Sequence, residues 1–276
     1  MTDVSLDATP HGAGPIVHRA GAVAQAYELA RRSTVNMWRQ PQAWVPGLFF
    51  PLMLTAVYAA QFAKAIHQPG FPPVDSYLDF VLPASVLQAV AFGATGGAAE
   101  LAKDIENGFF DRLVTSPVSR VSILVGRIAG SAIFAGFQAG VIMVLLIAFG
   151  VSIKGGVAGA AVIMITAVLL ALGIGGLGLV LALRSGSQEI VQSTFPVLFV
   201  LLFVSGTFWP TSLMKGLYGN VARHNPITWI IEPLRELVIQ GWSWSAAGRA
   251  LGITFGLAVV TTSLAFATMR ARLRRL

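Results

Sequence analysis

The sequence has no cysteine and few charged residues. Asp, Glu, Lys and Arg make up 11% of its 276 residues, whereas a soluble domain has about 25%. Without cysteine there can be no disulfide bond, thiolate nucleophile or Cys-ligated metal. The histidines are scattered and match no metal-ligand spacing. These absences exclude a soluble enzyme and any thiol-dependent chemistry.

Charged residues are missing altogether from six long runs. The runs cover residues 40–63, 80–99, 128–153, 155–183, 190–214 and 250–269. About 20 apolar residues suffice for a helix to cross the hydrocarbon core of a bilayer, and every run reaches that length. Residues 141–147 are apolar at every position, which excludes the alternating strands of a membrane β-barrel. The sequence therefore predicts an all-α, polytopic membrane protein with six transmembrane helices.

Lys and Arg are unevenly distributed between the two sides of these helices. Six crossings put both termini on one side, which then has 12 basic residues against six on the other, with Arg127 near an interface left out. Because basic residues concentrate on the cytoplasmic side, both termini are expected in the cytoplasm. This placement accounts for the net charge of +7, so nucleic acid is not an expected partner.

Residues 20–38 have the pattern of an amphipathic helix. Apolar side chains recur at helical spacing from Val23 through Tyr27 to Trp38, opposite Glu28 and Arg31. We expect this helix to lie on the cytoplasmic leaflet. A loosely ordered basic leader held by anionic lipid is the alternative. In both cases residues 1–40 form a cytosolic N-terminal segment ahead of a transmembrane part at 41–276.

Small residues are frequent in the second to fourth predicted spans. Glycines four residues apart, such as Gly93 with Gly97 and Gly126 with Gly130, allow helices to approach closely. They predict tight helix packing, and a role as hinges is the alternative.

The predicted spans lack groups that could couple transport to an ion gradient. No Asp, Glu, Lys, Arg or His lies inside them apart from Arg127 near one end, whereas ion-coupled carriers place such groups near the bilayer midplane. The sequence also lacks a G-x4-G-K-[ST] loop for nucleotide phosphates. If the protein transports a substrate, the energy is expected to come from another polypeptide.

Uncharged polar and aromatic side chains make the second and fifth spans candidates for a substrate path. The candidate residues are Gln88, Thr95, Gln192, Thr194, Phe195 and Phe199. Phe203 continues the spacing of four, so three rings share one helix face. An apolar substrate pathway, a dimer interface and aromatic packing inside the bundle all fit this pattern.

The stretch 100–120, between the second and third spans, mixes apolar and charged side chains. Asn107 and Gly108 break one helix, and residues 109–114 form a short second one. Four acids and three bases accompany the aromatic residues, which suits docking on a protein better than insertion into lipid. The residues assigned to this surface are Glu106, Gly108, Phe109, Phe110, Asp111, Arg112, Leu113, Pro117 and Arg120.

The same stretch carries a family resemblance. Its pattern D-x-E-x-G-x-x-D-R-L-x-x-x-P-x-x-R, from Asp104 to Arg120, resembles the cytosolic coupling segment of ABC-2 type exporter permeases, especially the daunorubicin-resistance-like exporters. Asp104 and Phe109 depart from the commonest form of that segment. The resemblance implies that residues 41–276 are an ABC-2 type transmembrane domain and that the helix at 109–117 is pushed by an ATPase.

The resemblance also implies partners and a location. A second copy of the permease, or a related permease, and two separate ABC ATPase subunits would complete the transporter. ATP and Mg would be bound by the ATPase, and no cofactor by this chain. The cargo would be an amphipathic drug, lipid or glycan exported across a bacterial plasma membrane, with membrane lipid as a further contact.

Residues 225–242 form a second unusual segment. Prolines and charged residues interrupt it too often for a span, yet it is too apolar for a free loop. The resemblance assigns it to external re-entrant helices before the last span, with the candidate residues Pro226, Trp229, Glu232 and Arg235. Glu232 and Arg235 are three apart and are expected to pair or to meet water in an outward vestibule. A plain interfacial helix is the alternative.

Two other functions stay open on the sequence. One is a secondary active carrier, although the midplane charges that it needs are absent. The other is a membrane-embedded lipid-modifying enzyme, although no His, Asp and Glu constellation is visible near an interface. ATP turnover that requires a partner ATPase would distinguish an exporter subunit from both.

Overall fold

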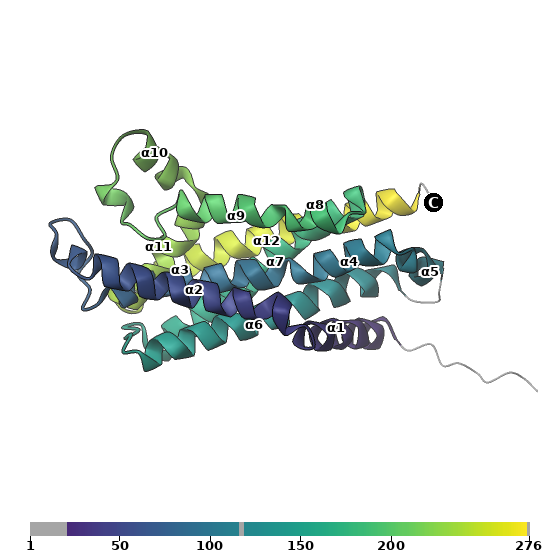
Figure 1. Ribbon diagram of the computed structural model, residues 1–276, viewed down its shortest axis with the longest axis horizontal. Helices are drawn as coiled ribbons and strands as arrows, with labels where there is room; N and C mark the ends of the chain where they lie inside the picture. Colours follow the sequence, from purple (N-terminus) through teal and green to yellow (C-terminus); the bar gives the residue numbers. More distant parts are fainter. Residues whose placement is uncertain (1–20, 116–118, 275–276) are drawn as a thin grey trace, which may run out of the picture.

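A computed structural model gives the structure of the protein for residues 21–115 and 119–274. These residues form helices joined by turns and contain no β-strand, which confirms the all-α prediction. Figure 1 shows long helices side by side along one axis, with short helices at both ends. In chain order the described elements are α1 (Ala22–Trp38), α2 (Pro41–Phe62), η1 (Ala65–His67), α3 (Tyr77–Ala94), α4 (Gly96–Glu106), α5 (Phe109–Thr115), α6 (Arg120–Ala148), α7 (Gly156–Ser185), α8 (Gln188–Gln192), α9 (Thr194–Phe203), η2 (Thr211–Leu213), α10 (Gly216–His224), α11 (Pro226–Ile239) and α12 (Trp244–Leu273).

Five segments in the described part of the chain are helical, long and apolar enough to cross a membrane. They are Trp44–Phe62, Tyr77–Glu106, Arg120–Ala148, Gly156–Ser185 and Trp244–Leu273. They coincide with the first four predicted spans and with the last one. The second segment combines α3 and α4, which meet at Thr95.

The predicted fifth span, at residues 190–214, is not one long helix. α8 ends at Gln192, α9 ends at Phe203, and the chain then turns. Pro196 has no N–H to donate to the carbonyl of Gln192 four residues earlier, which favours a break between the two helices. The apolar segment Gln188–Phe203 is shorter than the five spans.

α3 lies at the centre of the bundle, packed against α2, α6, α7 and α11. Its N-terminus is held by a reciprocal cap, in which Ser76 and Asp79 each accept a backbone N–H of this turn. Asp79 also accepts the N–H of Ser152 at 3.1 Å. The start of α3 is thereby tied to the loop between α6 and α7.

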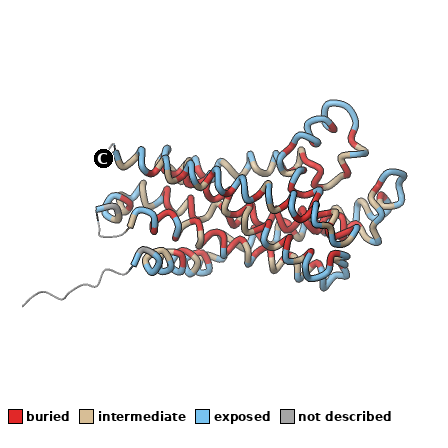
Figure 2. Tube along the Cα trace, turned by 180° about the vertical axis from the view of Figure 1, so that it is seen from behind, coloured by how far each residue is buried: buried red, intermediate tan, exposed pale blue. Residues whose placement is uncertain are grey.

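The outer helices leave apolar faces on the outside of the bundle. In an 18-residue apolar stretch of the span of α3 and α4, 78% of the residues are buried, against 17% in such a stretch of α2 and 28% in one of α12. Figure 2 shows the buried residues gathered along the middle of the bundle. Such apolar outer faces suit contact with lipid or with another apolar protein surface.

α1 packs along α6 through two glycines. A Cβ atom on Gly126 or Gly130 would lie 3.1 Å from the carbonyl oxygen of Ala26 or Ala30, respectively, closer than most side-chain carbons come to a neighbour. The prediction that this glycine pair mediates close helix packing is therefore confirmed.

The predicted amphipathic helix is present as α1, but its innermost face differs from the expected one. Ala30, Ser33 and Met37 are buried against the bundle, whereas Val23 is 84% exposed and Tyr27 66% exposed. The helix is thus fixed to the bundle by the face that carries Ala30, Ser33 and Met37. Val23 and Tyr27 lie on the outside of the bundle.

Candidate functional site

The short helix α5 lies at the end of the bundle where α12 also ends (Figure 1). It follows α4 after a turn in which Gly108 has a φ of +66°, a left-handed conformation that costs glycine little. The predicted helix break at Asn107 and Gly108 is confirmed, as is the short helix that follows it.

Phe109 and Leu113 lie on the partly exposed side of α5. They border a cavity of about 490 Å³ whose opposite wall is α1. The guanidinium carbon of Arg32 lies 5.4 Å from the centre of the Phe109 ring, and that of Arg112 lies 5.8 Å from it. Cation–π attraction at these distances links α1 to α5.

Phe110 points the other way. It is fully buried and packs in a cluster with Leu101, Leu124 and Leu183, and the Arg272 guanidinium carbon lies 5.8 Å from the centre of its ring. The prediction that Phe110 shares an exposed docking surface with its neighbours is therefore wrong. Adjacent residues on a helix point about 100° apart, and this one faces the core, where it anchors α5.

The charged residues around α5 are exposed but differ in their contacts. Asp111, Arg112 and Arg120 are exposed. Glu106 is exposed as well, but its carboxylate accepts the backbone N–H of Gln188 at 2.7 Å, so it joins α4 to the start of α8. Pro117, also assigned to this surface, lies outside the described residues.

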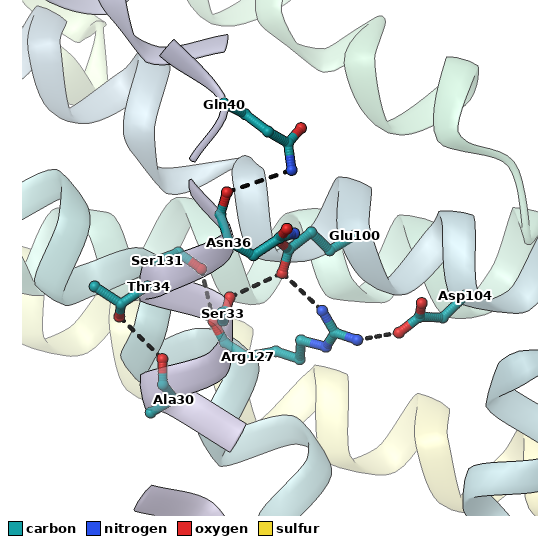
Figure 3. A network of polar contacts seen from close by, with 9 residues as sticks. All are labelled: Ala30, Ser33, Thr34, Asn36, Gln40, Glu100, Asp104, Arg127 and Ser131. Carbon is teal, nitrogen blue, oxygen red and sulfur yellow. Dashed lines mark hydrogen bonds and ion pairs between the residues drawn. The ribbon is translucent and has the colours of Figure 1, made fainter. Parts of the chain in front are cut away.

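Arg127 joins three helices near the cavity between α1 and α5 (Figure 3). Its guanidinium donates to Glu100 at 2.7 Å and also pairs with Asp104, both on α4. Glu100 accepts further hydrogen bonds from Ser33, at 2.8 Å, and from Asn36, both on α1. The Arg127 side chain is only 13% exposed, so this network fixes α1 and α4 to α6.

An apolar groove runs along α9. Phe195 and Phe199 line it together with Pro46, Phe50, Phe92 and Pro196, and its volume is about 340 Å³. The Phe195 ring lies 4.4 Å from that of Phe92, centre to centre, and the Phe199 ring lies 5.6 Å from that of Phe50. The groove thus joins α2, α3 and α9.

The polar residues of the predicted path do not all lie with these rings. Gln192 borders a smaller cavity next to the groove. Gln88 is 2% exposed, and neither it nor Thr95 lines the groove or that cavity. Thr194 has a buried hydroxyl without a partner in the described residues. The structure brings together Gln192, Phe195 and Phe199, and leaves Gln88 in the bundle interior.

α11 is a continuous helix at the opposite end of the bundle, packed against α3, α7 and α12. Pro226 occupies its first position, and Asn225 caps it while donating to the Leu201 carbonyl at 2.7 Å. Trp229 is 47% exposed and donates its indole N–H to the Arg223 carbonyl at 2.8 Å. These contacts fasten α11 to α9 and α10.

Arg235 does not pair with Glu232 and does not face an open vestibule, contrary to the prediction. It is 6% exposed and donates to the carbonyl of Phe80 at 3.0 Å and to those of Gly206 and Thr207 at 2.9 and 3.0 Å. Gly206 and Thr207 belong to the buried turn after α9, where backbone carbonyls lack helical partners and need other donors.

The surroundings of Arg235 act on its guanidinium group in two ways, through an aromatic contact and through burial. Its guanidinium carbon lies 3.6 Å from the centre of the Phe80 ring. Burial lowers the pKa of Arg235 to about 9, with Glu232 and Tyr77 acting in the opposite direction, so the guanidinium stays charged at neutral pH. Glu232 instead accepts the hydroxyl of Thr211 at 2.6 Å.

These features define a class of protein. In the described residues no group of three or more His, Asp or Glu side chains is placed to hold a metal ion. What the structure offers is a bundle of long apolar helices with a groove on its outside and a short helix displayed at one end. This is the architecture of a polytopic helical membrane protein.

Comparison with known proteins supplies the family. Residues 24–239 match the family model of the ABC-2 type transporter. The chain is 27% identical to a daunorubicin resistance ABC transporter permease protein of Streptomyces coeruleorubidus, over 95% of this chain and 94% of that protein. It is 26% identical to a putative transport permease of Cyanophora paradoxa, over 84% and 80% of the two chains. A probable doxorubicin resistance ABC transporter permease protein of Mycobacterium tuberculosis is 26% identical over 67% of each chain.

This chain belongs to the ABC-2 type transporter family, as the pattern at residues 104–120 indicated. Members of this family generally work with an ABC ATPase subunit. The matched range contains α5, the aromatic groove and α11, and with them every candidate site residue named from the sequence.

Proposed function

We propose that this chain is the membrane-spanning subunit of an ATP-driven exporter that moves an amphipathic drug, lipid or glycan out of a bacterial cell. ATP and Mg would bind to a separate ABC ATPase present in two copies. The names of two relatives refer to resistance to daunorubicin and to doxorubicin, which supports export of an amphipathic compound.

The position and chemistry of α5 carry the proposal. Phe109 and Leu113 are partly exposed at the end of the bundle, while Phe110 fixes the helix to the core. Apolar side chains surrounded by charges are typical of a protein docking site. Force applied to α5 would reach the bundle through Phe110 and through the turn to α4.

A topology of six crossings fits this function. α8 and α9, with the turns after them, would make the crossing that is not a single long helix. The end with α5 would face the cytoplasm, in agreement with the 12 basic residues assigned to that side. α10 and α11 would be re-entrant helices at the outer surface.

The aromatic groove would form half of the substrate path. It opens on the outside of the bundle, beside α2, in whose 18-residue apolar stretch only 17% of the residues are buried. A second copy of this chain, or a related permease, would cover this face and close the path between the two subunits. The rings of Phe195 and Phe199 would then contact the apolar part of the substrate.

The test is ATP turnover with and without this chain. The purified chain in lipid nanodiscs is mixed with candidate ABC ATPases, and the hydrolysis rate is measured as amphipathic compounds are added. We expect no turnover by the chain alone and substrate-stimulated turnover with the cognate ATPase. Transport by the chain alone, driven by an ion gradient, would show a secondary carrier and contradict the proposal.

A further inference from the structure

A second cavity adjoins the aromatic groove, and five amide side chains border it. Its volume is about 200 Å³. The amides that border it are Asn36, Gln40, Gln138, Gln188 and Gln192. They come from α1, the turn after it, α6 and α8, so segments far apart in the sequence converge here. We call this space the amide-lined cavity.

Gln138 is the most buried of these amides, with an exposed fraction of 0%. Its Nε2 donates to the carbonyl of Trp44 at 3.2 Å, but its Oε1 has no partner in the described part of the chain. A buried acceptor without a donor costs free energy, which a bound molecule can remove. Because Gln138 borders the amide-lined cavity, a ligand there could supply the missing donor once the enclosed amide turns toward it.

Two glycines make room for the Gln138 side chain. A Cβ atom on Gly47 of α2 would lie 2.8 Å from its Nε2, and one on Gly93 of α3 would collide with its Oε1. Any larger residue at these positions would displace the amide. Gln138 therefore occupies a fitted position between α2 and α3, at the border of the cavity.

The charges at the cavity do not favour a charged ligand. Glu100 and Lys103 are the charged residues that border it, and they are opposite in sign. Glu100 is already engaged by Arg127 and by α1 (Figure 3). An amide group offers both a donor and an acceptor, which matches hydroxyl or amide groups of a ligand better than a phosphate or an ammonium.

Aromatic rings complete the cavity and connect it to the groove. Trp44, Phe92 and Phe134 border the amide-lined cavity, and Phe92 also lines the aromatic groove. The two spaces are therefore adjacent, one rich in hydrogen-bonding groups and the other apolar. An amphipathic molecule could place its two parts in the two spaces at once.

We propose that the amide-lined cavity binds the uncharged, hydroxyl- or amide-bearing head group of the substrate while the apolar body lies in the aromatic groove. The inference rests on the proposed export function and narrows the substrate class to neutral-headed amphiphiles. Gln138 and Gln192 are the residues that would contact the head group.

Binding to the chain alone tests the inference, with no ATPase present. The chain in nanodiscs is titrated with three fluorescent probes: methylumbelliferyl glucoside, methylumbelliferyl glucuronide and free methylumbelliferone. They share one ring system and differ in carrying a neutral sugar, an anionic sugar or none. Fluorescence anisotropy gives each Kd, and we expect the glucoside to bind about tenfold more tightly than the other two, as one or two net hydrogen bonds would produce.

Two variants and a matched control locate the binding. Gln138→Leu and Gln192→Leu should each weaken glucoside binding about five- to tenfold and leave free methylumbelliferone unaffected. Gln192 is exposed, so its replacement decides the question even if Gln138→Leu fails to fold. Gln240→Leu changes an exposed glutamine after α11, far from the cavity, and should bind all three probes like the unmodified chain.

Several outcomes would overturn the inference. These are equal or absent binding of the three probes, tighter binding of the glucuronide, or unchanged glucoside affinity in Gln192→Leu. If head-group selectivity is missing while a partner ATPase shows chain-dependent turnover, the head-group site is refuted and the exporter stands. Selective glucoside binding without any chain-dependent turnover would support the site and refute the exporter.

Discussion

Arg127 on α6 donates a hydrogen bond of 2.7 Å to Glu100 on α4, and Glu100 in turn accepts one of 2.8 Å from Ser33 on α1. The same guanidinium pairs with Asp104, one turn further along α4. The three charged side chains are 13%, 17% and 22% exposed. Arg127 thus holds together α1, α4 and α6, next to the start of α5.

Replacement of Arg127 by methionine should destabilise the fold strongly. Two mostly buried carboxylates would lose their cation, which costs about 3–5 kcal/mol in the free energy of unfolding. Denaturant unfolding in detergent micelles measures the change. Arg249→Met is the matched control, because Arg249 pairs with Glu236 while 55% exposed, and such a pair is worth about 0–1 kcal/mol. Equal losses in the two variants would contradict the structural role of Arg127.

The double replacement Phe109→Ala with Leu113→Ala should release the ATPase without harming the membrane fold. An apolar anchor that becomes well buried in an interface is typically worth about 2 kcal/mol or more, whereas an exposed ion pair is worth about 0–1 kcal/mol. Asp111→Ala, which alters an exposed charge on the same helix, is the control. Co-purification of the ATPase and substrate-stimulated turnover are the measurements, and a double variant that keeps both would show that α5 is not the coupling element.

Phe110→Ala should destabilise the fold more than Phe109→Ala does. Because Phe110 is fully buried, its truncation should lower the free energy of unfolding by about 3–5 kcal/mol. Phe109→Ala should lower that free energy by only about 1 kcal/mol, since its ring is partly exposed and loses mainly its cation–π contacts. Thermal unfolding of the two single variants, without any ATPase, makes the comparison. Similar midpoints would mean that α5 is not anchored through Phe110.

Phe195→Ala with Phe199→Ala should change which compounds are exported. The two rings line the aromatic groove, and their removal takes away much of its apolar surface. Resistance profiles of cells that express each variant, corrected for membrane expression, give the result. Phe255→Ala, on the outer face of α12 and 59% exposed, should leave the profile unchanged. An unaltered profile in the double variant would assign the rings to packing alone.

Residues 1–40 and 270–276 should face the cytoplasm, and residues 210–245 the outside. The Cys-free sequence allows single cysteines to report this directly. In intact cells an impermeant thiol reagent should label Ser212→Cys and not Ser5→Cys, and cell lysis should expose both. The reverse labelling pattern would invert the topology.

The long helices could be predicted from the sequence because bilayer thickness and the cost of burying charge act on every residue of a run. The interruption at Ser193 was missed, since the run stays uncharged while Pro196 removes one backbone donor. Composition thus locates apolar segments well. It does not show whether the backbone within them is continuous.

The candidate sites were harder to predict from the sequence than the long helices, because they depend on which side of a helix meets the core. Phe109 and Phe110 are equally apolar, and only packing against α4, α7 and α12 separates the exposed ring from the buried one. Gln138 gave no signal beyond a single amide in an apolar run, and its partner Trp44 lies 94 residues earlier. The acceptor of Arg235 on α3 lies 155 residues away, so its inward direction could not be read from the spacing to Glu232.

The position of Arg235 has a mechanical consequence for the end of the bundle that carries α10. A single guanidinium bonds to α3 and to the turn after α9 at the same time. If α11 moved away from these elements, the buried guanidinium would lose three carbonyl acceptors within a short displacement. The free energy of separation would therefore rise steeply at first and then level off. This end of the protein should therefore resist gradual widening and open abruptly, over a threshold.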